Sequence, residues 1–570
     1  MKSRARLSWV IFGLLCCAFA AGVSAQPDVE AYNRGVNAST AKNWDLAINE
    51  YNYAIQLNPR NLLAYYNRAI SYREKGNYQQ CVTDNTSAAN LNPNYDSAYI
   101  NRAVCYYNLG QVDLAIADNT KAISLNPSSY NAHRNRGLEY ASKKNYDAAI
   151  ADFTKAIQLN AYLPDNYNSR ALAYFNKGLF DLALADYDKS IQLSANQALP
   201  FYNRGLTYSR KREYDKAIAD YDKYISMRPT DSSNLSDAYM SRSYANLQKA
   251  KYDQAVADAS KAIEINAIND GAYYNRGLGN YNLKKYDAAV ADFSKVLEID
   301  PSYNEIFYSR GRTFYYQGRY AETIADMTKS LEFFPDDDDA HYFRGLAYFN
   351  ERKSVDANAD LSKCIELNPK ADNCYIHRGF NYIDMREYAK AIADYDKALE
   401  LDAKDSSPYI NKSLAYLYMN DGDKAYEQAV TYLELNGLKT SGPYAAISGY
   451  LGLRKAKKAL GAKAFLETWL AQSKPEVWMT NVLKYFHGDM TAAQLLELAT
   501  DNGKLTQAHA YIGAMQMLAG TPVPAKVHFN WVKDTGDKAL VEYDLAIAEL
   551  NRSSAPAKPA ATTKKPKRGN

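Results

Sequence analysis

Arginine and acidic side chains recur in this chain at a fixed spacing, and such pairs are the first candidates for ionic or acid–base chemistry. An arginine returns with a nearly constant period, and an acid stands sixteen residues after each one. The arginines are Arg34, Arg68, Arg102, Arg136, Arg170, Arg204, Arg242, Arg276, Arg310, Arg344 and Arg378. The acids are Glu50, Asp84, Asp118, Asp152, Asp186, Asp220, Asp258, Asp292, Asp326, Asp360 and Asp394. Eleven catalytic pairs in one chain are implausible, so we interpret the pairs, such as Arg68 with Asp84 and Arg276 with Asp292, as structural ion pairs that fix how two helices pack.

Asparagine is the second recurring polar residue. It stands directly before the arginine, or before the lysine that takes its place at position 412, in seven copies: Asn33, Asn67, Asn101, Asn135, Asn203, Asn275 and Asn411. Seven residues further on, the same stripe carries Asn108, Asn176 and Asn282. Carboxamides both donate and accept hydrogen bonds, so this ladder could bind the backbone of an extended peptide. The alternative is that these amides bond neighbouring helices and fix the stacking of the copies, and both interpretations stay open.

Four of the six cysteines stand at matching distances from a proline. Cys81 and Cys105 each lie twelve residues from Pro93, and Cys364 and Cys374 each lie five residues from Pro369. If each proline marks the turn between two antiparallel helices, the members of each pair face each other. We predict disulfides Cys81–Cys105 and Cys364–Cys374, with four free buried thiols as the alternative.

No other constellation predicts catalysis or a cofactor. The six histidines show no metal-ligand spacing, and no phosphate loop or nucleophile motif is present. The formal net charge of +4 includes no basic face typical of nucleic-acid binding. We therefore expect no cofactor, no metal and no enzyme activity.

The elements that position these residues are helix pairs. The segment Ala272–Pro301 is typical: apolar and small residues at helical spacing predict one helix from about 271 to 284 and a second from about 287 to 298. Proline after the second helix ends it. Twelve such copies, with Lys412 replacing arginine in the last, cover residues 26–437, and a period near 34 predicts a solenoid of helix pairs.

This pattern resembles the tetratricopeptide repeat (TPR) family. The resemblance implies an all-α fold, a right-handed superhelix of about twelve helix-turn-helix repeats, and binding of extended protein segments on the concave face. The asparagine stripe is similar to the ladder that lines the superhelix of O-linked N-acetylglucosamine transferases, although no catalytic domain of that enzyme follows. The carboxylate clamp of co-chaperone repeats is not matched, because its lysines do not recur.

The two ends of the chain depart from the repeat. Residues 1–25 have the pattern of a secretory signal peptide cleaved after Ala25, and Cys16 and Cys17 make a poor lipid-attachment site, so lipid anchoring is not expected. Residues 438–552 predict a C-terminal helical region that caps the solenoid, with its first helix from about 444 to 460. Its segment Trp478–Asp489 and residues 508–552 resemble bacterial envelope adaptors of the NlpI type, which implies a degenerate TPR pair there. Residues 553–570 predict a disordered basic tail.

These observations favour an exported scaffold or adaptor in the bacterial periplasm or cell envelope. Its expected partners are proteins or extended peptide segments, without nucleic acid and without an integral membrane span. The alternatives are a wall- or sugar-cleaving enzyme hidden in the solenoid and a scaffold for polysaccharide secretion. Whether the chain forms homo-oligomers is left open.

Overall fold

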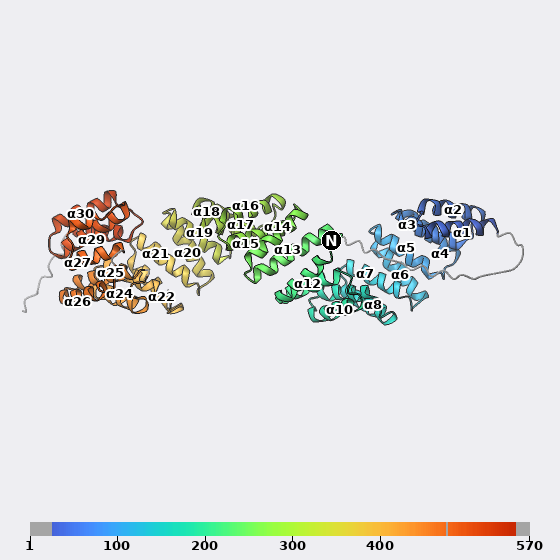
Figure 1. Ribbon diagram of the computed structural model, residues 1–570, viewed down its shortest axis with the longest axis horizontal. Coiled ribbons are helices and arrows are strands. Elements are labelled where there is room, and N and C mark those ends of the chain that lie inside the picture. The colour runs from blue at the N-terminus through green and yellow to red at the C-terminus, as the bar shows by residue number, and fades with distance from the viewer. Residues whose placement is uncertain (1–25, 440, 475–476, 555–570) are drawn as a thin grey trace, which may run out of the picture. The chain divides into compact units, whose positions relative to one another are not determined.

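The computed structural model describes residues 26–439, 441–474 and 477–554. Within these ranges every regular element is an α-helix, 31 in all, so the all-α prediction is confirmed (Figure 1). The predicted signal peptide, with Cys16 and Cys17, and the tail from residue 555 onward lie outside the described residues. Residues 553 and 554, assigned to the tail from sequence, are instead the last residues of helix α31.

Two compact units divide the chain between Ala272 and Tyr273, and each is described by itself. The first unit contains α1 to α14 and the first residues of α15. Its helices are α1 (Pro27–Thr40), α2 (Trp44–Leu57), α3 (Leu62–Glu74), α4 (Tyr78–Leu91), α5 (Asp96–Asn108), α6 (Val112–Leu125), α7 (Tyr130–Ser142), α8 (Tyr146–Leu159), α9 (Pro164–Asn176), α10 (Phe180–Leu193), α11 (Leu199–Arg210), α12 (Tyr214–Ser226), α13 (Ser232–Gln248) and α14 (Tyr252–Ile265).

The second unit continues the helix pairs and adds the C-terminal region. It contains most of α15 (Asp270–Asn282), then α16 (Tyr286–Ile299), α17 (Ile306–Tyr316), α18 (Tyr320–Phe333), α19 (Asp338–Asn350), α20 (Ser354–Leu367), α21 (Asp372–Asp384), α22 (Tyr388–Leu401), α23 (Ser407–Tyr418) and α24 (Gly422–Asn436). The remaining helices are α25 (Gly442–Lys455), α26 (Ala459–Leu470), α27 (Trp478–His487), α28 (Ala492–Glu497), α29 (Asn502–Leu518), α30 (Pro522–Thr535) and α31 (Val541–Ser554).

Each pair from α1–α2 to α23–α24 consists of a first and a second helix joined by a tight turn. One residue of the turn has a positive φ: it is Gly76 in α3–α4 (φ 80°) and Lys284 in α15–α16 (φ 59°). Within the pair the two helices approach closely where the first helix has glycine. A Cβ atom added at Gly277 would lie 2.5 Å from Cε1 of Phe293, which is fully buried. A glycine and an aromatic residue at the same spacing recur in other pairs.

The irregular step of the repeat is absorbed without breaking the packing. The step from Arg204 to Arg242 is four residues longer than the others. The four extra residues lengthen α13 to 17 residues, and the Asp231 carboxylate caps its start by accepting from the Ser233 and Asn234 backbone N–H groups. Because about 3.6 residues make one helical turn, four residues extend α13 by about a turn and leave the faces of the following helices in phase.

The C-terminal region contains one more repeat-like helix pair than the sequence predicts. The expected helix from 444 to 460 ends at Lys455 because Lys457 adopts a positive φ of 60°. Helices α25 and α26 then pack like a repeat pair, since a Cβ atom added at Gly449 would lie 2.8 Å from Cζ of Phe465. Helices α29 and α30 make the same close approach through Gly513 and Phe529.

Helix α31 packs mainly on α29 and α30, and its side chains also reach the first helices α23 and α25. The Tyr418 hydroxyl of α23 donates to the Val541 carbonyl at 2.8 Å, and Arg552 Nη2 donates to the Tyr418 carbonyl at 2.9 Å. Lys455 of α25 forms an ion pair with Glu549 at 2.5 Å, and both side chains are buried. This end of the stack is therefore covered by helix α31 of the same chain.

Candidate functional site

The first helices of the pairs form the inner side of each unit. Within a unit, the first helix of one pair contacts the first helix of the next, as α3 contacts α5 and α17 contacts α19. The second helices of the described pairs make no comparable contacts with one another. The first helices are thus closer together, and a ligand that lies along the inner surface meets their side chains.

The arginine of each first helix is bound on two sides. Arg170 donates to Asp186 of its own pair through Nε at 2.7 Å and Nη2 at 2.8 Å, and through Nη1 to Thr154 of the preceding pair at 3.0 Å. Comparable bidentate bonds join Arg68 to Asp84 and, at 2.6 to 3.1 Å, Arg276 to Asp292. The bond to the preceding pair is absent from the sequence-based prediction. It makes Arg170, and also Arg68, whose Nη1 donates to Asn52 at 2.5 Å, a bridge between successive pairs.

Lys412 shows the same bridge in reduced form. Asp394 is the last acid of the series, and position 428 of the twelfth pair is glutamine, so no carboxylate follows Lys412 at the usual spacing. Its ammonium group instead binds Asp396, in the preceding helix α22, at 2.5 Å. The bond across the pair is lost and the bond between the pairs is kept.

The direction in which the pKa of each carboxylate is shifted depends on how many groups donate hydrogen bonds to it. Burial raises the pKa of Asp84, and the Arg68 guanidinium offsets this only in part. Burial also acts on Asp360, but hydrogen bonds from Arg344 and from His341, whose Nδ1 lies 2.8 Å away, outweigh it and lower the pKa. These groups serve packing, because each carboxylate is saturated by donors and buried.

Three of the asparagines that precede the arginine bond a neighbouring first helix or second helix. Asn67 Nδ2 donates to the Tyr32 hydroxyl of the preceding pair at 2.9 Å, and Asn203 Nδ2 donates to Asn168 Oδ1 at 3.2 Å. Asn101 is buried, accepting from Arg73 Nη1 at 2.5 Å and donating to Asn85 at 3.2 Å. At these positions the geometry favours the stacking role over ligand binding.

The other members of that set are not alike. Asn33 is exposed on α1, and Asn275 is buried on α15. Asn411 Nδ2 donates to the Ser407 carbonyl of its own helix at 2.7 Å. Asn135 is buried, and its Nδ2 has no hydrogen-bond partner. The structure therefore does not bring the seven residues into one uniform ladder.

Asn108, Asn176 and Asn282 form a different, exposed set at the end of their first helices. Each donates its Nδ2 to the backbone carbonyl four residues earlier, at 2.8, 2.7 and 2.8 Å. Those earlier residues are Val104, Leu172 and Leu278, which lie on the same face because residues four apart are neighbours on a helix. We call these two rows, six and two residues after the arginine, the inner stripe of each unit.

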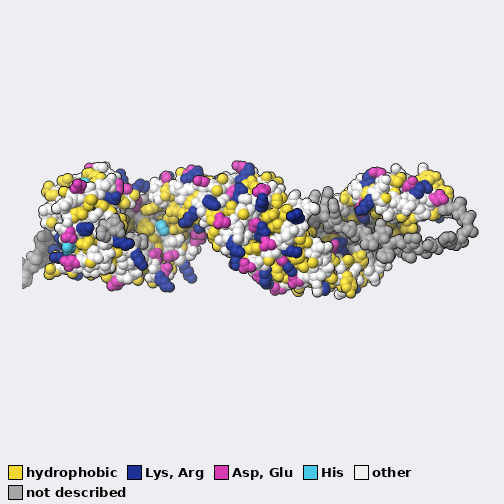
Figure 2. All heavy atoms as spheres, in the orientation of Figure 1, with side chains coloured by type: hydrophobic (Ala, Val, Ile, Leu, Met, Phe, Trp, Pro, Cys, Tyr) yellow, Lys and Arg dark blue, Asp and Glu magenta, His cyan; other side chains and the backbone are white. Residues whose placement is uncertain are grey.

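Large apolar side chains of the inner stripe reach solvent. Leu172 is 43% exposed, Tyr244 is 42% exposed and Tyr316 is 46% exposed. The stripe thus combines apolar contact area with carboxamides that are held in place by their own helix. Figure 2 shows that Lys and Arg side chains are interspersed with Asp and Glu side chains over the visible surface of the described residues.

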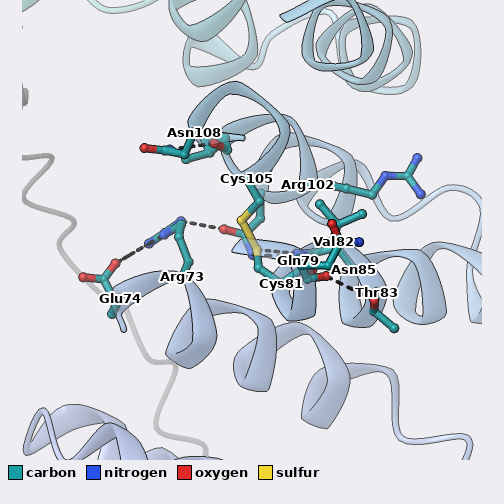
Figure 3. The surroundings of a disulfide bond; sticks show 12 residues. Arg73, Glu74, Gln79, Cys81, Val82, Thr83, Asn85, Arg102, Cys105 and Asn108 are labelled. Carbon is teal, nitrogen blue, oxygen red and sulfur yellow. Dashed lines mark hydrogen bonds and ion pairs between the residues drawn. A yellow bond between two sulfur atoms is a disulfide. The ribbon is translucent and has the colours of Figure 1, made fainter. Parts of the chain in front are cut away.

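Both cysteine pairs are disulfide-bonded in the structure. Cys81 of α4 and Cys105 of α5 have Cα atoms 6.3 Å apart, and Cys364 of α20 and Cys374 of α21 have Cα atoms 6.4 Å apart. Figure 3 shows the first disulfide between two helices, with Asn85 beside it. Each disulfide joins the second helix of one pair to the first helix of the next, so both tie successive repeats together.

Metal and membrane chemistry find no support in the described part of the chain. No group of three or more His, Cys, Asp or Glu side chains there is placed to hold a metal ion. None of the helices between residues 26 and 554 combines the length and apolar character that crossing a bilayer requires. His509 and His528 do meet, with their Nδ1 atoms 2.8 Å apart, but within the described residues no third ligand joins them.

Five sequence models, each of a tetratricopeptide repeat, match the chain and together cover more than half of it. The matched residues are 97–129, 130–162, 198–231 and 271–303, then 50–83, 373–405, 308–367, and finally 164–197 and 236–269. The search of curated proteins finds no match. Many solved structures contain similar chains.

Three of the solved structures illustrate the range of these similarities. YrrB, described as a TPR protein with an unusual peptide-binding site, is 25% identical over 33% of this chain and 95% of its own, with a TM-score of 0.30. A tetratricopeptide repeat protein from Parabacteroides merdae is 22% identical over 45% of this chain and 99% of its own, with a TM-score of 0.37. A chain of the APC/C hetero-tetramer Cut9–Hcn1 is 15% identical over 81% of this chain and 96% of its own, with a TM-score of 0.34.

Proposed function

Since the chain belongs to the tetratricopeptide repeat family, whose members are scaffolds for protein–protein interaction, we propose that it is an adaptor of the bacterial cell envelope that binds extended segments of partner proteins on its inner stripe. The observation that carries this proposal is the inner stripe itself. Exposed Leu172 and Tyr244 supply apolar area, and Asn176 beside Leu172 presents a carboxamide whose Nδ2 is fixed to the helix. Rigid aromatic and apolar contacts with nearby amides suit a ligand that is recognised through both its side chains and its backbone.

The envelope location rests on separate features. Residues 1–25 have the pattern of an export signal, and disulfides persist in oxidising compartments such as the periplasm. The resemblance of the C-terminal region to NlpI-type adaptors favours partners that build or remodel the envelope. We propose a binding role rather than a catalytic one, because tetratricopeptide repeats generally serve as non-enzymatic scaffolds.

Site-specific photo-crosslinking tests the binding face directly. A photoreactive amino acid at Leu172 on the inner stripe should capture partner proteins from intact cells. The matched control is Leu182, which is 50% exposed but lies on the second helix α10. Equal capture from both positions, or capture from Leu182 alone, would show that partners bind another face.

The compartment is tested by trapping thiols in the same cells. The mature protein should begin at Gln26, and Cys81, Cys105, Cys364 and Cys374 should resist alkylation until a reductant is added. A protein that retains the segment 1–25, and in which these four thiols react without reductant, would refute the envelope proposal and leave the binding face untouched.

A further inference from the structure

One cation interrupts the apolar row of the inner stripe in the second unit. Two residues after the arginine, the successive pairs carry Leu278, Arg312, Leu346, Phe380 and Leu414. Among these five, only the pair α17–α18 places a charge there. The last position, Leu414, lies beside α31 in a small cavity that Val541 and Leu545 also line, so Arg312 stands in the part of the row that α31 does not cover.

Arg312 is held between two aromatic rings from neighbouring first helices. Its guanidinium carbon lies 5.1 Å from the centre of the Tyr281 ring of α15 and 5.4 Å from the centre of the Phe343 ring of α19. Tyr308 and Tyr316 of α17 add their polar rings to the same surroundings. Aromatic faces attract a guanidinium, and rings that lie against it shield it from water.

The charge of Arg312 is not neutralised by an ion pair. Two residues earlier, Arg310 binds Asp326 at 2.7 and 2.8 Å, whereas among the described residues no carboxylate lies within ion-pair distance of Arg312. Its Nε atom is buried and has no hydrogen-bond partner. The charge of Arg312 acts on Asp339 of α19. Burial and the neighbouring acids raise the pKa of Asp339, and Arg312 lowers it in part.

We propose that Arg312 binds the side-chain carboxylate of an Asp or Glu residue in the extended partner segment. This inference rests on the proposed function and names a ligand group for one position of the inner stripe. The rings of Tyr281 and Phe343 lie against the guanidinium, and hydrogen bonds with Tyr308 and Tyr316 occupy part of its edge. A ligand would bind the N–H groups that remain on the half-buried side chain. A carboxylate matches that edge with two parallel hydrogen bonds, and partial burial strengthens them relative to water.

The carboxylate belongs to a side chain rather than to a peptide end. Within the second unit, first helices lie on both sides of α17: α15 precedes it, and α19 and α21 follow. A segment that lies along this row therefore continues past Arg312 in both directions. That placement suits an acidic residue in the middle of the bound segment.

Selection from a library of random peptides tests this inference. The peptides are about 18 residues long and have acetylated and amidated ends. We compare the full-length protein with Arg312→Leu, which restores the leucine found at this position in other pairs, and with Arg312→Gln. The matched control is Arg319→Gln in the same pair, because Arg319 is an exposed arginine paired with Glu322 at 2.8 Å. Hydrogen exchange of α15 to α20 verifies that each variant is folded.

The expected result is an Asp or Glu enriched at one position among peptides bound by the wild type and by Arg319→Gln, and not by the Arg312 variants. Changing that acid to Asn or Gln should weaken binding to the wild type about tenfold and leave binding to Arg312→Leu unchanged. Peptides that bind with no acidic preference would overturn the inference while the proposed function stands. A requirement for a free C-terminus would overturn the side-chain source, and a wild type that binds no peptide would overturn the proposed function as well.

Discussion

Replacing Asp186 by Asn tests whether the arginine bridges hold successive pairs together. The Asp186 side chain is 10% exposed and that of Arg170 is 17% exposed, so neither group can regain full hydration when the pair is broken. Asn keeps one oxygen for Arg170 and loses the second charge-assisted bond. Hydrogen bonds to charged groups contribute about 1.5–3 kcal/mol, and removal of one partner from a buried pair costs about 3–5 kcal/mol. With this partial exposure we expect Asp186→Asn to destabilise its pair by about 2–4 kcal/mol.

Hydrogen exchange measured by mass spectrometry gives the local free energy of opening. The loss should appear in α8 to α11, because a repeat contacts only its neighbours, and α19 and α20 serve as an internal reference. The exposed pair Lys261–Glu264 provides the control: its side chains are 57% and 61% exposed, and Glu264→Gln should cost less than about 0.5 kcal/mol.

A double variant separates the effect of the two charges from the effect of the volume that their side chains occupy. Arg170→Met with Asp186→Leu removes both charges, and we expect it to recover stability to within about 1 kcal/mol of the wild type. If Asp186→Asn opens no faster than Glu264→Gln, the bridge does not stabilise the stack. If the double variant is as unstable as the single one, an unpaired buried charge is not the cause of the loss.

Three further substitutions probe other contacts. Changing Cys81 and Cys105 to Ser should lower stability by about 3.5 kcal/mol at most, because the disulfide closes a loop with a sequence separation of 24. Reductant should lower the melting temperature of the wild type by more than that of the variant, which keeps only Cys364–Cys374. Gly277→Ala should destabilise α15–α16 by about 1–3 kcal/mol in hydrogen exchange, since the added Cβ meets the buried Phe293 ring; an unchanged pair would show that the ring can move. Burial raises the pKa of Glu139 to about 8 from its usual 4.5, so its contribution to stability is complete below pH 4.5 and is lost as the pH rises through 8. Glu139→Gln should remove this pH dependence and be the more stable form above pH 8, and a melting curve that keeps the wild-type slope would contradict the assignment.

The helix pairs were predictable because their signals are local and repeated. Helical spacing, a closing proline and one arginine per copy locate both helices of Ala272–Pro301 to within a few residues of α15 and α16. The pair α25–α26 was missed as a repeat because it has no arginine and its turn residue Lys457 follows Asn420 by 37 residues, whereas Asn420 follows Arg386 by 34. Its position is shown instead by Ser448, whose hydroxyl lies 2.8 Å from that of Ser413 in the first helix of the preceding pair.

The roles of individual polar residues could not be assigned from their spacing. Asn67 and Asn108 both lie on first helices, yet one bonds Tyr32 of the preceding pair and the other bonds its own backbone. The difference depends on which side chains the neighbouring helix presents, and the spacing of residues within one copy carries no information about them. Arg312 could not be recognised from the sequence either. A single charge in an apolar row becomes a candidate binding residue only when the rings of Tyr281 and Phe343 are seen beside it.

The two-sided arginine has a consequence for how the gene can change in length. Thr86, Thr120 and Thr154 are the partners behind Arg102, Arg136 and Arg170, so these three junctions are chemically interchangeable. Duplication or loss of whole copies at these junctions leaves each guanidinium facing an acceptor on both sides, whereas an insertion of one residue turns the later side chains of its helix by about 100°. Recombination between copies can therefore shorten or lengthen the array in steps of one repeat. Insertions of a few residues are tolerated only where, as in α13, they add about one full helical turn.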